Sequence, residues 1–377
     1  MKKKMLLLAM AALLTAAFVP AAFAADTMTQ AELETAINQA DPGDTVEVTG
    51  DVTLNSPISI DKALTLDGNG YTLTATYTDD AVLKTTTAAL VTIQNLTIDS
   101  TQAAFDLVHA QAHVIFKDST LMAQARGIRY MQSGDSTSSE LILDNTKVLN
   151  NGKPADASYD TWTDHNQTRG ISLWGMNDAT ITVKNGSEIL GYSYAFNMVG
   201  DTNSDGVRDY HDSTINVIDS TIKGWTAFNV WCANSTINIT NSYLKGINNS
   251  NGLSDGFATI VVNDDIYGNG WGRAAANKFN IKGGTITSYR SGLATEQLFR
   301  IDNEGVTKVN FTGSSRVKTK FIDGTGDSAS VFYSGYGALD DTDWETFLAD
   351  NVTDEEKYGI LNGYNGAEMS WIPVNIG

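Results

Sequence analysis

The chain has 377 residues, a formal net charge of −19, one cysteine and five prolines. A chain this acidic repels nucleic acid and anionic membrane surfaces. We therefore expect no nucleic-acid partner. The single cysteine, Cys232, excludes an internal disulfide, and stability must come from the core or from the core and a metal ion.

The first 24 residues have the three parts of a secretory signal peptide. Lys2, Lys3 and Lys4 form a basic region, residues 5–18 are apolar, and residues 22–24 read Ala-Phe-Ala. A membrane anchor is the alternative, but the apolar run is short for a span. We therefore expect a secreted or cell-surface protein that is not transmembrane and is a monomer.

A short helix is predicted directly after the signal peptide. Thr29 and Glu32 have capping-box spacing, and Pro42-Gly43 stops the pattern. The apolar stripe of this helix is Leu33, Ala36, Ile37 and Ala40. Such a helix would cover the open first coil of a repeat protein, which is otherwise an adhesive edge.

The rest of the chain repeats one short unit, an alternating strand followed by a bend and another strand. Copies such as "INVIDSTI" from Ile215 and "INITNSYL" from Ile237 start 22 residues apart, and longer spacings carry insertions. Alternation places every second side chain, such as Ile215 and Val217, on one face. A single unit cannot bury that face alone, so we predict a parallel β-solenoid of roughly ten coils.

One position of the unit is an amide, an acid or a glycine in every copy. These residues tolerate the left-handed backbone region, and a bend that needs this conformation once per coil explains them. The column is Asn95, Asp118, Asn145, Asn185, Asp219, Asn241, Gly283 and Gly313.

A second strand of the unit aligns at residues 126–131, 169–174, 194–199 and 226–231. Alternation turns Ile128, Ile171, Phe196 and Phe228 inward, followed by Leu173, Met198 and Val230. It turns Arg129, Ser172, Asn197 and Asn229 outward in one column. A second outward column is Met131, Trp174, Val199 and Trp231.

Trp174 and Trp231 would then lie two coils apart, or roughly 10 Å. That spacing suits stacking on an extended sugar chain, with Asn197 and Asn229 as hydrogen-bonding partners. The alternative is that inserted loops cover these tryptophans. Alternation also turns Cys232 inward, where a thiol is inert.

Residues 201–212 read D-x-N-x-D-G-x-x-D-x-x-D, which matches a calcium-binding loop. The expected ligands are Asp201, Asn203, Asp205, Val207 through its carbonyl oxygen, Asp209 and Asp212. Arg208 departs from the pattern, and a strand rather than a helix follows. We expect a structural Ca²⁺ that ties an insertion to the solenoid; the alternative is a solvated acidic turn.

Near the C-terminus, Thr342 and Glu345 again have capping-box spacing, with Trp344, Phe347 and Leu348 on one helical face. This predicts a small helical cap. The expected organisation is a signal peptide at 1–24, a β-helix domain at 25–337 and a C-terminal cap or tail at 338–377.

The segment "AELETAINQADPGDTVEVTGDVTL…ISIDKALTLDGNGYTL" resembles the N-terminal region of pectate-lyase-like, right-handed parallel β-helices. The resemblance extends over residues 29–335 and implies an all-β, right-handed parallel β-helix. It is specific for fold rather than function, because this fold carries lyases, hydrolases and adhesins. The acidic, exported character is similar to that of the adhesive domains of bacterial surface proteins.

The signatures of the enzymes with this fold are absent from the sequence. None of the prolines stands two residues after an arginine, and the G-H-G and R-I-K motifs are missing. We therefore expect a protein that acts by binding a polysaccharide or cell-surface ligand. The alternatives are a divergent Ca²⁺-dependent polysaccharide lyase or glycoside hydrolase using Arg129 or Arg169, and a passenger fragment with a purely structural role.

Overall fold

The computed structural model describes most of the chain from Thr27 to Tyr289 and isolated strands beyond it. Residues 1–26 and the C-terminal tail, including the expected cap at 342–348, lie outside the described residues. The described ranges are 27–130, 138–150, 168–174, 177–199, 212–232, 234–246, 258–262 and 277–289, with strands at 297–301, 308–311, 316–322, 333–334, 337–338 and 372–373.

A sheet of ten parallel strands forms the first face of the solenoid. Each strand pairs in register with the strand of the next coil, as Ile215 does with Ile237. The strands are β1 (Thr45–Glu47), β4 (Leu64–Asp67), β7 (Leu90–Gln94), β10 (His113–Lys117), β13 (Glu140–Asp144), β16 (Thr180–Lys184), β18 (Thr214–Ile218), β20 (Thr236–Thr240), β23 (Lys278–Lys282) and β26 (Lys308–Phe311).

A larger sheet supplies the second and third faces, because β17 (Glu188–Val199) and β19 (Thr221–Trp231) run through both. The second face also contains β2 (Val52–Leu54), β5 (Thr72–Ala75), β8 (Thr97–Ser100), β11 (Thr120–Ala123), β14 (Lys147–Asn150), β21 (Tyr243–Gly246), β24 (Thr285–Tyr289) and β27 (Arg316–Ile322). The third face also contains β3 (Ile58–Ile60), β6 (Ala81–Thr85), β9 (Ala103–Leu107), β12 (Arg126–Tyr130), β15 (Arg169–Trp174), β22 (Ala258–Val262) and β25 (Gln297–Ile301).

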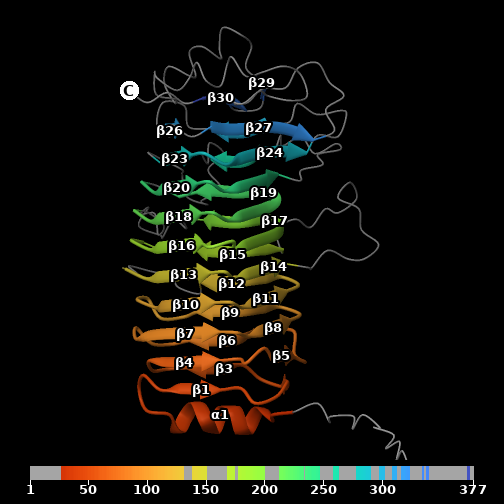
Figure 1. Cartoon of the computed structure of the whole chain (residues 1–377), viewed down its shortest axis with the longest axis vertical. Helices are drawn as coiled ribbons and strands as arrows, with labels where there is room; N and C mark the ends of the chain where they lie inside the picture. The colour runs from red at the N-terminus through yellow and green to blue at the C-terminus, as the bar shows by residue number, and fades with distance from the viewer. Residues whose placement is uncertain are drawn as a thin grey trace, which may run out of the picture.

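The coils stack in chain order along one axis, so the chain is an all-β, right-handed parallel β-helix (Figure 1). The ten strands of the first face match the number of coils expected from the repeats. Antiparallel pairing occurs at the C-terminal end, between β28 (Tyr333–Ser334) and β29 (Gly337–Ala338), and between β27 and β30 (Ile372–Pro373).

The core is the continuous row of inward side chains that alternation predicts. Ile215, Val217, Ile237 and Ile239 are buried, as are the inward positions expected on the third face. Phe196 and Phe228 stack in the middle of the solenoid with ring centroids 4.8 Å apart. Cys232 is also buried, as expected.

The bend column has the expected left-handed backbone. The φ angles of Asn95, Asp118, Asn145, Asn185, Asp219 and Asn241 lie between 47° and 58°, and that of Gly283 is 69°. Some of the bend side chains also bond along the stack, as Asn145 Nδ2 donates to Asp118 Oδ1 at 2.6 Å. Gly313 lies outside the described residues.

The helix α1 (Gln30–Gln39) lies across the N-terminal end of the stack, beside β1 (Figure 1). Thr29 caps it, and the Thr29–Glu32 capping box is formed from both sides. Leu33 and Ile37 are buried in the continuous core. The predicted helix is therefore confirmed, with its apolar stripe packed on the first coil.

Candidate ligand-binding face

The third face carries the column of outward positions expected from the sequence. Strand register aligns Lys84, Asp106, Arg129, Ser172, Asn197 and Asn229 from coil to coil. The predicted alignment is confirmed, but the side chains from Asp106 to Asn229 are buried. Alternation gives the direction of a side chain but not what covers it, so the sequence did not show this burial.

Asn197, Asn229 and Trp231 form one hydrogen-bonded chain on this face. The Trp231 indole Nε1 donates to Asn229 Oδ1 at 3.0 Å, and Asn229 Nδ2 donates to Asn197 Oδ1 at 2.8 Å. Asn197 is 1% exposed and Asn229 is 5% exposed, whereas Trp231 is partly exposed. The asparagines therefore hold the tryptophan in place rather than presenting their amides to solvent.

The indole sets the direction of this chain. An indole N–H can only donate, so Asn229 must turn its oxygen toward Trp231 and its NH₂ toward Asn197. Asn197 then accepts with its oxygen, and its own Nδ2 is buried without a hydrogen-bond partner among the residues that the structure describes. A buried unsatisfied amide costs about 1–3 kcal/mol, and such groups are few in folded proteins.

Trp174 and Trp231 occupy the same register position. Trp174 in β15 pairs with Val199, which pairs with Trp231 in β19. The two positions are thus two strands apart, or about 10 Å at the usual strand spacing. The backbone spacing predicted for a stacking pair is present; the Trp174 side chain and all of Met131 lie outside the described residues.

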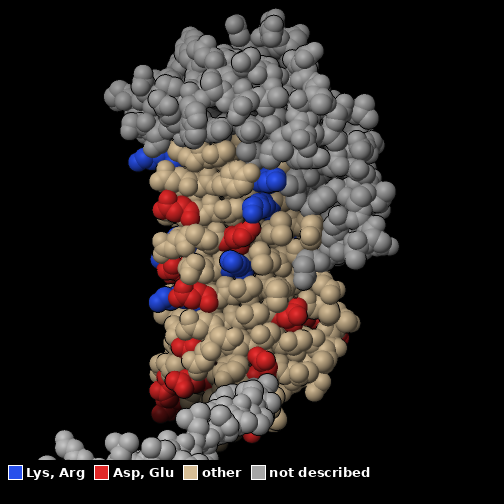
Figure 2. Space-filling view, turned by 45° about the vertical axis from the view of Figure 1, so that its right-hand side comes forward, with Lys and Arg blue, Asp and Glu red and all other residues tan. Residues whose placement is uncertain are grey.

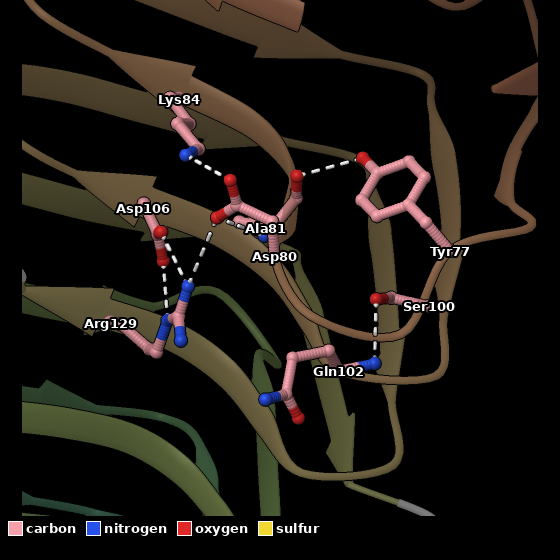
Figure 3. A network of polar contacts seen from close by, with 8 residues as sticks. All are labelled: Tyr77, Asp80, Ala81, Lys84, Ser100, Gln102, Asp106 and Arg129. Atoms are coloured by element: carbon pink, nitrogen blue, oxygen red, sulfur yellow. Dashed lines mark hydrogen bonds and ion pairs between the residues drawn. The ribbon is translucent and has the colours of Figure 1, made fainter. Parts of the chain in front are cut away.

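A charged network occupies the N-terminal part of the same column (Figure 3). Arg129 binds Asp106 through both edges, Nε to Oδ1 at 2.7 Å and Nη2 to Oδ2 at 2.6 Å. Asp80 reaches this pair from the loop before β6, with Oδ1 at 3.6 Å from Arg129 Nη2, and also binds Lys84. Tyr77 donates its hydroxyl to the Ala81 carbonyl at 2.8 Å, which closes that loop.

The carboxyl groups of the network have opposite pKa shifts. Burial raises the pKa of Asp106, although Arg129 opposes the shift with its hydrogen bonds and charge. Burial alone would also raise the pKa of Asp80, but hydrogen bonds from Lys84 and the Ala81 N–H, with the charges of Lys84 and Arg129, hold it below its ordinary value. Asp106 is therefore the carboxyl group of the network on which burial has the larger effect.

The two arginines of the enzymatic alternative have different surroundings. Arg129 is committed to Asp106 and is 8% exposed. Arg169 is partly exposed, with Nη1 at 3.4 Å from Ser172 Oγ. Burial, followed by the charge of Arg126, lowers the pKa of Arg169 to about 10. Of the two, Arg169 is the more exposed, and no carboxylate of the described residues is bonded to it.

The calcium loop lies almost entirely outside the described residues. Asp201, Asn203, Asp205, Val207 and Asp209 are not described, and Asp212 alone can be placed. Asp212 is exposed, has a φ of 55° and stands just before β18. Within the described ranges, no group of three His, Cys, Asp or Glu side chains is arranged to hold a metal ion.

Acidic groups dominate the N-terminal coils. Between Thr27 and Ala110 the only lysines are Lys62 and Lys84, and no arginine precedes Arg126 in the chain. Figure 2 shows acidic side chains over these coils and both signs of charge on the described coils above them. In the part of the chain that the structure describes, no helix is long and apolar enough to cross a membrane.

Two functional features were missed from the sequence. Asp106 lies in "AAFDL", which the aligned copies of the second strand did not include. Arg126 was missed because strict alternation from Ile128 would turn it inward. Instead Gly127 faces inward, where an added Cβ would lie 2.2 Å from Val148 Cγ1, and Arg126 is partly exposed. The Arg-Gly pair shared by 126–127 and 169–170 was the available signal.

No protein family matches the chain, and no curated protein matches it. Among solved structures the chain is similar to a protein described as Geobacillus virus E2 ORF18, with 12% sequence identity and a TM-score of 0.29. That match covers 80% of this chain and 58% of the other chain. A TM-score this low supports no conclusion about function, so the function must be argued from the site.

Proposed function

We propose that the chain is an exported, adhesin-like β-helix protein that binds an extended carbohydrate through its third face, around Trp231. The observation that carries the proposal is the hydrogen-bonded chain from Trp231 through Asn229 to Asn197. A ring that is partly exposed and already held by its N–H loses little freedom when a ligand stacks on it. The register-matched position of Trp174 supports a second contact on the same ligand.

Export is part of the same proposal. The signal-peptide pattern at residues 1–24 would direct the chain out of the cytoplasm, where polysaccharides and cell surfaces are the accessible partners. The acidic coils near α1 favour a neutral ligand or one that carries a counter-ion, because the net charge of −19 repels polyanions.

Replacing Trp231 with alanine should weaken glycan binding about ten-fold, because a central aromatic contact contributes on the order of 1–2 kcal/mol. The ligand is first found on an array of immobilised polysaccharides, and the affinity is then measured by titration calorimetry. Trp231→Phe keeps a stacking ring but loses the N–H that holds it to Asn229, so it should retain only part of the affinity.

Tyr243→Ala is the matched control, since it removes a partly exposed aromatic ring from the second face. It should leave the affinity unchanged. If Trp231→Ala and Tyr243→Ala lose affinity equally, or if neither loses any, the ligand binds elsewhere and the proposal is refuted.

We also propose that residues 201–212 bind one Ca²⁺ with a structural role. Four carboxylates, one amide oxygen and one backbone carbonyl make a donor set of hard oxygens, which suits Ca²⁺. Asp212 leads directly into β18, so an ion held there would fix the insertion to a strand of the first face.

Removal of Ca²⁺ with EDTA should therefore lower the Tm by about 2–4 °C for each kcal/mol of binding energy lost, and excess Ca²⁺ should restore it. Differential scanning calorimetry measures the change. Asp205→Asn should have the low Tm and no response to Ca²⁺, while Asp178→Asn, at another exposed bend, should respond as the unmodified chain does. A Tm that is independent of both EDTA and Asp205 would mean a solvated turn.

A further inference from the structure

Around the start of β12 and β15, positively charged side chains outnumber the carboxylates. Lys84 is paired with Asp80, and Arg129 is paired with Asp106 and lies near Asp80. Two positive charges remain without a carboxylate among the described residues, and both belong to arginines. The groups in this inventory are the cations Lys84, Arg126, Arg129 and Arg169 and the anions Asp80 and Asp106.

The two unpaired arginines lie side by side. Strand register pairs Arg126 in β12 with Arg169 in β15, so their backbones are about 4.8 Å apart. Each side chain is partly exposed, yet each Nε is buried and has no hydrogen-bond partner within the described ranges. The next position in the register is Tyr194, so no carboxylate follows the arginines in this row.

This arrangement costs free energy in the unliganded protein. Burial and then the charge of Arg129 lower the pKa of Arg126, and Arg169 is affected in the same way by burial and Arg126. Two guanidinium groups at this separation repel each other. Their buried N–H groups have also lost their hydrogen bonds to water without gaining a partner among the described residues. Arg129, by contrast, has its charge balanced by a carboxylate of the neighbouring coil, that of Asp106.

We propose that Arg126 and Arg169 form a binding site for a tetrahedral oxyanion with two negative charges, such as the terminal phosphate group of a ligand or the free phosphate or sulfate ion. Such a group neutralises both guanidiniums at once and offers oxygens in different directions to each of them. A single carboxylate carries half of the required charge, and its two oxygens are satisfied by one guanidinium edge. The site is separate from Trp231 and does not depend on glycan binding there.

The test uses inorganic phosphate, sulfate and acetate as probes on the full chain, at low millimolar concentration and constant ionic strength set with NaCl. Phosphate or sulfate should raise the Tm by about 2–4 °C in a saturable way, and acetate should have little effect. Equilibrium dialysis with radiolabelled phosphate and sulfate should give one site per chain and show which of the two is preferred.

Arg126→Gln removes one charge and relieves the repulsion. It should keep or raise the Tm without added anion, and it should lose at least ten-fold in anion affinity. Arg169→Gln should behave in the same way. Lys117→Gln, which removes an exposed charge from the first face, should keep the full response.

Three results would overturn the proposal. One is a Tm rise of equal size in Arg126→Gln and the unmodified chain, which is the general salting-out effect of these ions. Another is the absence of any saturable response. The third is a fall of several degrees in the Tm of Arg126→Gln without anion, which would mean that a carboxylate of the chain itself already pairs with the arginine.

Discussion

Truncation of Phe228 to alanine is expected to lower the free energy of unfolding by about 3–5 kcal/mol. Phe228 lies in β19 and is fully buried, stacked on Phe196 of the preceding coil with an interplanar angle of 6°. Its loss removes the buried apolar surface and leaves a cavity between two long strands that join the second and third faces. Parallel strands above and below hold the backbone, so little collapse can fill the space.

Urea denaturation followed by circular dichroism measures this effect. Leu90→Ala is the control, because Leu90 is 50% exposed on the first face and its loss should change the free energy by less than about 0.5 kcal/mol. Phe228→Leu should fall between the two. A loss below about 1 kcal/mol for Phe228→Ala would show that the two rings do not form a rigid layer of the core.

The fold could be predicted from the sequence because every coil of a solenoid needs the same pattern of residues. Each coil needs inward side chains at alternate positions and one bend residue that tolerates positive φ, so each copy confirms the others. Asn95 and Asn241 lie five coils apart in the first-face count and have φ angles of 51° and 47°. The capping helix was equally predictable, since the Thr29–Glu32 box is a local interaction.

The candidate site could be predicted only in part. The strand register follows from the repeat, so the alignment of Asn197 with Asn229 and of Trp174 with Trp231 could be predicted. Burial of Asn197 and Asn229 was not, because alternation gives the direction of a side chain but not what packs over it. Arg126 was not identified for a different reason: Gly127 and Gly170 allow close approach of the backbone and interrupt the strict alternation.

The ion pair of Asp106 and Arg129 also escaped prediction, although its energetic weight is large. The partners come from adjacent coils, 23 residues apart, and neither stands in a motif. They meet because β9 and β12 pair in register, which places position 106 against position 129. Neither side chain is more than 9% exposed, so the pair has little screening from solvent.

Asp106→Ala is therefore expected to lower the free energy of unfolding by about 3–5 kcal/mol, because it leaves the buried guanidinium of Arg129 with only Asp80, at 3.6 Å. Replacing both partners, as Asp106→Leu with Arg129→Met, should restore most of that loss. Burial raises the pKa of Asp106, which reflects the cost of desolvating its carboxylate. Apolar side chains of similar volume can often replace a buried ion pair without loss of stability.

A double-mutant cycle measured by urea denaturation separates these effects. Lys84→Met, at the exposed side of the same network, should cost less than about 1 kcal/mol and serves as the control. Additive losses in the double variant would contradict the argument, because they would mean that the two side chains stabilise the fold independently. Asp106→Ala also frees a third guanidinium beside Arg126. Added phosphate or sulfate should therefore recover part of its stability, and this recovery should disappear when Arg126 is replaced with glutamine.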